Sequence, residues 1–516
     1  MRTASAFRQP TFLLLAAAVI AGLGCAPQRD PQTVVMLIES NPLSLDPRVG
    51  TDAQSERIGS LIFDSLLRRD RNSNLQPWLA ERWEVLDPLT YRFHLRPGVR
   101  FHDGKPLTAR DVRYTFQSLL SGEIQSLKAS NFSRIASVEA GDDSTVLIRL
   151  KEPYASFLWN LTQGALGIVP EGAGKDLGRQ PVGSGPFRFV SAAQDEDVVL
   201  ERNPDYWAEP PRIERVQFRI VPDATTRALE LRKGSADIAL NVLTADMVAA
   251  LRREPDLQVT HEAGNSYQYI ALNLANPRLT LPVRQAIARA INRDELVASL
   301  WQNLVRPASS ILPPEHWAYR SDLAPYAYDP QRAEELLDQA GLPPGPDGVR
   351  LRLVYKTSTD QAARELASVI QDQLARVGIA LDIRSFEFAT FYSDITKGNF
   401  DLFSLRWIGG NDDPDIFEYC FHSAKFPPAG ANRGHYSNPD VDRLIDQSRA
   451  STDLSLRRAA YHQVQQILHD DLPYIHLWYL DNVAVHSRRI SNLHVFPTGS
   501  YDFLAEIEAA PIETTR

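Results

Sequence analysis

Apolar and polar residues follow a regular strand and helix pattern in the middle of the chain. The pattern predicts, in chain order, a strand over 349–355, a helix over 363–377, a strand over 379–383, a helix over 388–397 and a strand over 400–405. Gly378 and Gly398 stand at the predicted helix ends, where a left-handed residue is favoured. We therefore predict three parallel strands joined by right-handed helical crossovers.

Shorter patterns predict further elements on both sides of this region. Strands are expected over 34–38 and 90–95, and helices over 109–120, 283–291 and 330–340. The helix over 109–120 has the strongest start signal, because Thr108 and Asp111 have the spacing of a capping box. Asp329, Pro330 and Gly341 are the expected cap, first-turn proline and terminating glycine of the helix over 330–340.

The loop that follows the last of the three parallel strands is a candidate binding site. Ligands of open α/β sheets bind outside the carboxyl ends of the strands, and residues 407–415 (WIGGNDDPD) follow such an end. The loop combines an aromatic side chain, two glycines and several polar residues. The alternative interpretation is a solvated turn in which Asp412 or Asp415 caps the next element.

The first 24 residues predict export. Arg2 and Arg8 flank an apolar run over 12–23, which is about half the length that a membrane span requires. The segment is therefore predicted to be a signal peptide covering residues 1–24. Its removal takes away two arginines and no acid, which changes the net charge from −9 to −11.

Only two cysteines occur, Cys25 and Cys420, so the chain has no disulfide framework. The segment 21–25 (AGLGC) resembles a bacterial lipobox, in which the cysteine receives diacylglycerol. Lipidation of Cys25 would leave 25–32 as a tether on a membrane surface. The alternative is a free cysteine beside an ordinary cleavage site.

Composition and missing motifs narrow the function classes. The chain has 516 residues, of which 43% are apolar and 23% charged, and its length predicts about three domains. Nucleic acid is a poor partner for its negative charge. The chain lacks the G-x-S-x-G, H-E-x-x-H, C-x-x-C and P-loop motifs, so hydrolase, zinc-site and NTPase chemistry is not indicated. We expect no cofactor and no metal site.

Taken in order, several motifs resemble the extracellular solute-binding proteins of family 5, which include the dipeptide- and oligopeptide-binding proteins of ABC importers. The stretches that carry the resemblance are 101–116 (FHDGKPLTARDVRYTF), 182–187 (VGSGPF), 201–207 (ERNPDYW), 222–238, 269–292, 311–314 (ILPP), 328–341 (YDPQRAEELLDQAG) and 407–415. The resemblance as a whole extends over nearly the whole exported chain.

The resemblance implies a two-lobed α/β binding protein, type II-like, with an extra inserted domain and a ligand cleft between lobes joined by hinge strands. The implied parts are lobe one (33–50, 182–262 and 480–516), the inserted domain (51–181) and lobe two (263–479). It also implies a monomer that captures di- or oligopeptides and delivers them to ABC permease subunits in the inner membrane, without enzymatic activity. The protein would act in the periplasm or at the cell surface.

The residues that bind peptides in the family do not all have counterparts in this sequence. The aspartate that binds a peptide ammonium falls at Gly410, with Asp412 two residues later as a substitute, and the carboxylate-binding arginine falls near Thr357 or Ser358, beside Lys356. The segment 426–438 resembles a second cleft loop. The implied ligand-binding set is Tyr355, Lys356, Trp407, Gly409, Gly410, Asn411, Asp412, Asn432, Arg433 and Tyr436.

Other hypotheses stay open at this point. In the first, the chain is the same kind of receptor but binds an oligosaccharide, a metal chelate or an opine, because the charged groups expected to bind a peptide are not at the family positions. A periplasmic hydrolase that uses Asp412, Asp413 and Asp415 is a second. A sensory or chaperone-like module is a third.

Overall fold

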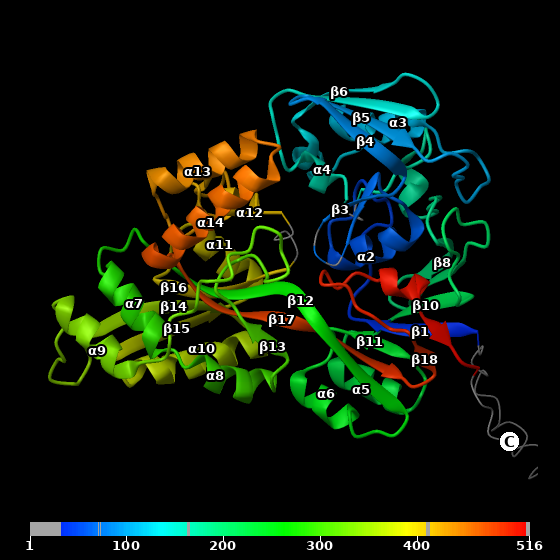
Figure 1. Ribbon diagram of the computed structural model, residues 1–516. Helices are drawn as coiled ribbons and strands as arrows, with labels where there is room; N and C mark the ends of the chain where they lie inside the picture. Colours follow the sequence, from blue (N-terminus) through cyan, green and yellow to red (C-terminus); the bar gives the residue numbers. More distant parts are fainter. Residues whose placement is uncertain (1–31, 71, 73, 163–165, 409–412, 512–516) are drawn as a thin grey trace, which may run out of the picture.

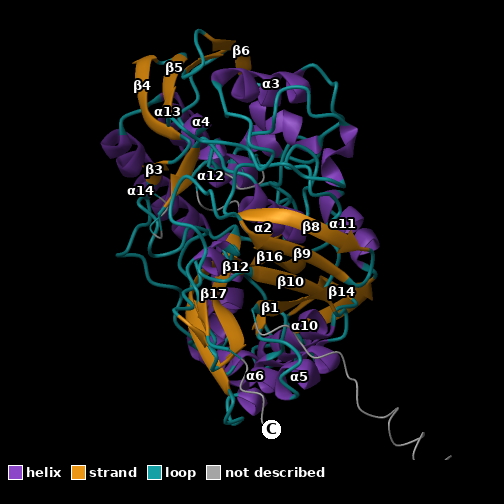
Figure 2. Cartoon of the chain, turned by 90° about the vertical axis from the view of Figure 1, so that its right-hand side faces the viewer, coloured by secondary structure: helices purple, strands orange, loops and turns teal. Residues whose placement is uncertain are grey.

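The computed structural model describes residues 32–70, 72, 74–162, 166–408 and 413–511. Cys25 and the loop residues Gly409, Gly410, Asn411 and Asp412 lie outside the described residues. A large eleven-stranded sheet runs through the molecule, and a separate four-stranded sheet lies at the opposite end from α5 (Ala224–Arg232) and α6 (Ala245–Leu251) (Figures 1 and 2). Among the described helices, none combines the length and apolar composition that crossing a bilayer requires.

The large sheet joins strands from both halves of the chain. Its order is β15-β14-β16-β12-β17-β11-β1-β10-β9-β8, with β13 paired to β17. The bounds are β1 (Thr33–Ile38), β8 (Phe187–Ala193), β9 (Asp197–Arg202), β10 (Arg215–Ile220), β11 (Ile238–Leu240), β12 (Leu257–Leu272), β13 (Val305–Pro307), β14 (Leu351–Ser358), β15 (Ile379–Phe386), β16 (Leu402–Trp407) and β17 (Tyr474–Ser487).

The predicted strand and helix alternation of lobe two is confirmed. Strand β14 pairs in parallel with both β15 and β16, and the connections are α10 (Gln361–Ala375) and α11 (Phe388–Thr396). Gly378 and Gly398 follow these helices with φ of +83° and +77°, the conformation that glycine adopts without steric cost. The helices α7 (Leu281–Ala290) and α9 (Pro330–Gln339) also lie where the apolar pattern predicts them.

Two long antiparallel strands, β12 and β17, cross from lobe two into lobe one (Figure 1). Their register shifts between Glu262 and Ser266, so three residues of β12 face a single residue of β17. Gly264 lies inside this bulge, and a Cβ there would sit 2.2 Å from the carbonyl oxygen of Leu480. The irregularity coincides with the predicted boundary between the lobes.

The four-stranded sheet lies in the predicted inserted domain. Its order is β4 (Ala80–Asp87), β5 (Thr90–Leu95), β7 (Thr145–Leu150) and β6 (Ile135–Ala140), and all neighbouring strands are antiparallel. Helix α3 (Ala109–Leu120) begins with the predicted capping box of Thr108 and Asp111. The same region contains β2 (Leu67–Arg69), β3 (Leu75–Pro77) and α4 (Phe157–Asn160).

The buried apolar side chains of the described residues form five clusters. Two lie within lobe two, on the strands and under α7, α9, α10, α12 (Ile416–Phe421), α13 (Pro439–Ala450) and α14 (Leu454–Asp471). One covers residues 66–168. The remaining two lie in lobe one, and α2 (Ala53–Ile62) packs into the larger of them together with β1 and β10.

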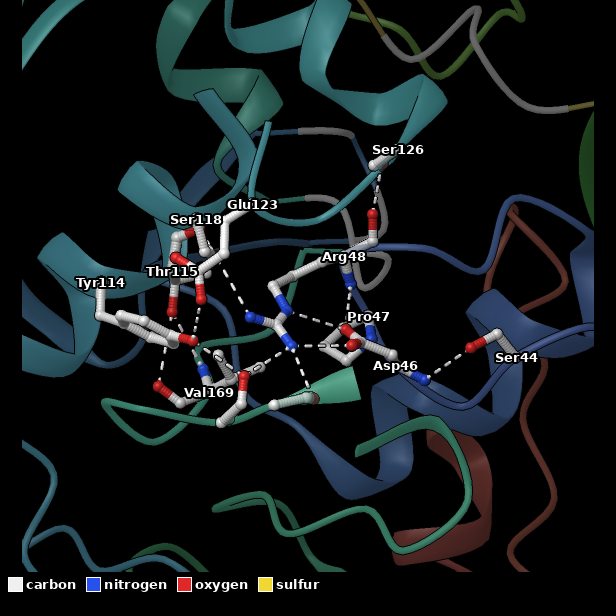
Figure 3. A network of polar contacts seen from close by, with 12 residues as sticks. Ser44, Asp46, Pro47, Arg48, Tyr114, Thr115, Ser118, Glu123, Ser126 and Val169 are labelled. Atoms are coloured by element: carbon white, nitrogen blue, oxygen red, sulfur yellow. Dashed lines mark hydrogen bonds and ion pairs between the residues drawn. The ribbon is translucent and has the colours of Figure 1, made fainter. Parts of the chain in front are cut away.

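A buried arginine fixes lobe one to the inserted domain (Figure 3). Arg48 is fully buried and donates from Nε and Nη2 to the two carboxylate oxygens of Asp46, at 3.0 and 2.8 Å. Its Nη1 donates to Ser118 Oγ of α3 at 3.1 Å, and Nη2 also reaches the carbonyl of Ala173 at 3.1 Å. The guanidinium therefore donates hydrogen bonds to acceptors on three segments of the chain. These bonds fix the three segments relative to one another.

The two ends of the described chain meet in lobe one. Arg489 donates from Nη2 to the carbonyl of Thr33 at 2.8 Å and from Nη1 to the carbonyl of Ala510 at 3.2 Å. Its Nε also pairs with the buried Asp237 at 2.6 Å. Short pairing of β18 (Ile490–Ser491) with β19 (Glu508–Ala509) completes this end of the molecule.

Candidate functional site

A cavity of about 920 Å³ opens between the inserted domain, lobe one and the end of β16 in lobe two. Ligand sites usually measure about 300–1,000 Å³, so the cavity is large enough for a sizeable small-molecule ligand. Its walls come from α2 and β2, from residues 154–162, from 206–212 and from 492–506. Lobe two contributes Ile408, Asp413, Asp415 and Ile416.

The carboxylate of Asp64 forms part of the cavity wall and binds four neutral donors. Oδ1 accepts from Trp78 Nε1 at 2.9 Å and from the Tyr206 hydroxyl at 3.0 Å. Oδ2 accepts from Trp207 Nε1 at 3.0 Å and from the Ser184 hydroxyl at 2.9 Å. Burial raises the pKa of Asp64, and the four hydrogen bonds act in the opposite direction. Asp64 thus fixes the aromatic side of the cavity.

Side chains of the inserted domain bind lobe two directly across the cavity. The Tyr154 hydroxyl donates to Asp415 at 3.0 Å, and the Ser156 hydroxyl donates to Asp413 at 2.6 Å. The backbone N–H of Ala155 donates to the carbonyl of Arg449 at 3.1 Å. We call these six residues the interlobe contact. It joins the two sides of the cavity through directional hydrogen bonds.

Two arginines of lobe two support this contact. Arg449 pairs with Asp415 at 2.5 Å and with Glu418 at 2.9 Å, and its guanidinium lies 5.7 Å from the ring of Tyr154. Arg457 is almost fully buried, lies 3.8 Å from Asp413 and stacks at 5.2 Å on both Trp159 and Trp317. Burial raises the pKa of Asp413, and the charge of Arg457 opposes that shift.

The first group of predicted site residues lies beside the cavity rather than in its wall. Tyr355 is fully buried in β14. Lys356 Nζ pairs with Asp394 at 2.7 Å and lies 4.4 Å from the ring of Phe386. Trp407 ends β16, half-buried, with its indole edge against Tyr419 at 6.1 Å. All three side chains pack within lobe two, and none of them lines the cavity.

The second predicted loop also packs inside lobe two. The Asn432 side chain donates to the carbonyls of His422 and Tyr436, at 3.1 and 2.7 Å, and accepts from the N–H of Tyr436 at 2.9 Å. The Tyr436 hydroxyl donates to Asp471 at 2.6 Å. These bonds hold both side chains inside lobe two, and neither residue lines the cavity.

Arg433 is the predicted residue with the most unusual surroundings. It is 4% exposed, donates to the Tyr392 hydroxyl at 2.7 Å and lies 6.0 Å from the ring of Trp407. Among the described residues its Nη1 has no hydrogen-bond partner. It belongs to the aromatic interior of lobe two and does not line the cavity.

The sequence patterns missed most of the cavity wall. Segments 154–162 and 492–506 carry no recognised motif, and their roles depend on contacts between residues hundreds of positions apart. Asp413 and Asp415 were expected to anchor a ligand or cap a turn. The structure instead bonds both to the inserted domain, although Asp413 also accepts from the N–H of Asp415 at 2.8 Å, as a turn residue does.

Comparison with known proteins gives one consistent family. The model for bacterial extracellular solute-binding proteins, family 5 (middle region), matches residues 74–426. Di/tripeptide-binding protein 1 of Pseudomonas aeruginosa is 30% identical over 491 residues, which is 89% of this chain and 90% of that protein. Heme-binding protein A of Haemophilus influenzae is 30% identical over 502 residues, or 91% of each chain.

Solved structures agree with these relatives. HbpA2 from Haemophilus parasuis has a TM-score of 0.82 at 27% identity, covering 93% of this chain and 100% of the other. DppA from Helicobacter pylori in complex with the peptide STSA has a TM-score of 0.75 at 28% identity, covering 92% and 98%. NikZ from Campylobacter jejuni in complex with Ni(L-His) has a TM-score of 0.78 at 26% identity, covering 93% and 100%.

Proposed function

The chain belongs to the bacterial extracellular solute-binding proteins of family 5, and from this premise we propose that it captures short peptides for an ABC importer. The observation that carries the proposal is the cavity of about 920 Å³ between lobes that are joined by β12 and β17. Relatives named as di/tripeptide-binding proteins and a neighbour solved with the peptide STSA support the choice of ligand.

A binding protein of this architecture acts by closing over its ligand. Closure about the crossing strands brings the two cavity walls together, so affinity depends on the free energy difference between open and closed forms. No bond is made or broken in this function, and peptides are expected to be recovered unchanged after incubation. A product that appears with time and disappears in Asp413→Ala would support the hydrolase hypothesis instead.

The test is a melting experiment on residues 26–516, refolded from denaturant to remove any ligand carried through purification. The melting temperature is followed against dipeptides, tripeptides, oligosaccharides, haem and nickel-histidine. A ligand at one hundred times its dissociation constant adds about 2.7 kcal/mol to the free energy of unfolding. Stabilisation by peptides supports the proposal. Stabilisation by haem or nickel-histidine alone would keep the receptor role and contradict the peptide assignment.

We further propose that Cys25 carries a lipid that holds the receptor on a membrane surface. The lipobox-like AGLGC segment supports this, together with membership in a family of bacterial extracellular solute-binding proteins. Wild-type protein expressed with its signal should partition into the detergent phase, and Cys25→Ala should remain in the aqueous phase. Equal partitioning of the two would contradict a lipid at Cys25.

Domain limits and ligand contacts remain proposals of the same kind. The bulge at Glu262–Ser266 supports the lobe boundary near 262, whereas the packing of α2 with β1 favours placing 51–63 with lobe one. Ligand contacts by Gly409, Gly410, Asn411 and Asp412 stay predictions, supported by the positions of Ile408 and Asp413 in the cavity wall. We also propose that the receptor is a monomer.

A further inference from the structure

Two arginines in the cavity wall form no ion pair with an acid among the described residues. Arg57 lies on α2 and Arg68 on β2, and both line the cavity. No carboxylate among the described residues forms an ion pair with either guanidinium. Arg212, which lines the same cavity, differs because it pairs with Glu508 and, at 3.5 Å, with Glu209. Arg57 and Arg68 therefore present positive charge that no ion pair among the described residues neutralises.

Aromatic rings fix the position of both guanidinium groups. Arg68 lies 4.6 Å from the ring of Trp78 and 5.7 Å from that of Phe496. Trp78 is itself held by its hydrogen bond to Asp64. Arg57 lies 5.5 Å from the ring of Tyr501. Stacking uses the flat face of a guanidinium and leaves its N–H edge available for an acceptor.

One loop brings the two groups to the same wall of the cavity. Phe496 contacts Arg68, and Nη2 of Arg57 lies 3.5 Å from where a Cβ on Gly499 would be. Both arginines thus lie against residues 496–501. A glycine at 499 leaves the space beside Arg57 open.

Among the described residues, no acid of the cavity wall forms an ion pair with Arg57 or Arg68. Asp64 is occupied by its four neutral donors. Asp502 accepts from the hydroxyls of Ser60 and Ser500, at 3.2 and 3.0 Å. Glu56 also lines the cavity and forms no ion pair with either arginine; burial raises its pKa, and the charges of Lys128 and Arg57 oppose that shift. An incoming carboxylate would find N–H donors without displacing an existing ion pair.

We propose that Arg57 and Arg68 bind the α-carboxylate of the peptide ligand. The inference rests on the proposed function and names the chemistry that selects its substrates. A carboxylate presents two acceptor oxygens, which the N–H fork of arginine matches, and such bonds are stronger in a partly enclosed site. The receptor consequently favours free peptides over peptides with a blocked C-terminus.

The test compares ligands before it compares variants. A randomised tripeptide library with free carboxylates is titrated against the wild-type chain, followed by the same library as C-terminal amides and as N-acetyl derivatives. The free library should bind about tenfold to a hundredfold more tightly than the amides. Amides that bind as tightly as free acids would overturn the proposal without any variant. Absence of binding by every wild-type titration would overturn the proposed function, and the inference with it.

Variants then assign the effect to the two arginines. Arg57→Gln with Arg68→Gln should abolish the preference for the free acid, whereas Arg212→Gln should preserve it. Arg68→Lys is added because loss of the Trp78 stack could unfold the chain; it keeps the charge and should retain part of the preference. A folded double variant that still prefers free acids as strongly as the wild type would overturn the assignment.

Discussion

The hydroxyl of Tyr154 donates a 3.0 Å hydrogen bond to Oδ2 of Asp415, a residue 261 positions later and on the other side of the cavity. In the closure proposed above, opening the cleft would separate these two groups, so the bond would stabilise the closed arrangement alone. Tyr154→Phe should therefore raise the dissociation constant for the ligand about threefold to tenfold, which matches the loss of one hydrogen bond.

Titration calorimetry on the refolded chain measures this effect. Tyr114→Phe is the matched control, since its hydroxyl donates to the carbonyl of Ala173 at 2.9 Å, away from lobe two. Equal affinity changes in the two variants would show that the interlobe contact does not contribute to closure.

Asp64→Asn should destabilise the protein by about 2–4 kcal/mol although it removes a buried charge. The carboxylate accepts two hydrogen bonds on each oxygen, and an amide offers only one acceptor oxygen. The NH₂ group of the new amide cannot accept, so two of the four N–H and O–H donors would lose their acceptor. Denaturant unfolding gives the free energy, with Glu209→Gln, an exposed acid on the same cavity, as the control. An unchanged midpoint would contradict this role for Asp64.

Stability should fall as the pH drops from about 6.5 to about 4, in part because of His102. Burial lowers the pKa of His102 to about 4, below the usual value of about 6.5. Its Nδ1 accepts from Gly183 N–H at 3.3 Å and its Nε2 lies 3.0 Å from the carbonyl of Gly185, which fits only the neutral ring.

The sign of this effect follows from the lowered pKa. Folding favours the neutral ring of His102, so its contribution to the free energy of unfolding is complete above pH 6.5. Below that pH the unfolded chain takes up a proton before the folded chain does, and the contribution is lost. The loss is at most about 3 kcal/mol, at about 1.36 kcal/mol per pH unit. In His102→Gln the slope of unfolding free energy against pH between 6.5 and 4 should be shallower. If the unfolding free energies of His102→Gln and the wild type changed in parallel with pH, the acid sensitivity would come from other groups.

Lys356→Met should lower stability and leave ligand affinity unchanged. The ammonium pairs with Asp394 at 2.7 Å inside lobe two, and it lowers the pKa of that carboxyl. Loss of the pair is expected to cost about 1–2 kcal/mol. Asp394→Asn should cost a similar amount, and the double variant little more than either. A loss of peptide affinity in Lys356→Met alone would restore its predicted role at the ligand carboxylate.

Gly264→Ala should strongly destabilise the chain at the crossing strands. The new Cβ would lie 2.2 Å from the carbonyl oxygen of Leu480, and only movement of backbone could relieve that clash. Gly59→Ala is the contrasting control, because a Cβ within α2 meets nothing within 4 Å and a helix gains about 0.5–1 kcal/mol from the exchange. Opposite shifts in melting temperature are expected, and shifts of the same sign would contradict the argument.

Local patterns predicted the elements whose stability is local. The capping box at Thr108, the alternation in β14 and the glycines at 378 and 398 each reflect interactions within a few residues, and the structure contains all of them. The strands β12 and β17 were foreseen only as hinge strands implied by the family resemblance. Their length and bulge depend on pairing between residues some 220 positions apart.

The cavity was harder to predict for a related physical reason. The loop over 407–415 was expected to contribute, and Ile408, Asp413 and Asp415 do line the cavity. Lys356, Asn432 and Tyr436 were chosen by residue type, but each polar group is satisfied by a neighbour within lobe two. Which partner a polar side chain takes is decided by tertiary packing, and residue type alone does not reveal it.

The hydrogen bonds of Arg489 determine which part of the molecule receives a force applied to either end of the chain. Thr33 and Ala510 are bound by the same guanidinium, so a pull on either end of the chain is received by lobe one. In the described part of the chain, lobe two is connected to lobe one through β12 and β17 and through contacts such as that of Gln302 with Asp246, and to the inserted domain through the interlobe contact. Tension on an N-terminal tether would therefore act on lobe one and would not separate the two walls of the cleft. The affinity for ligand should consequently be the same whether the protein is surface-bound or free.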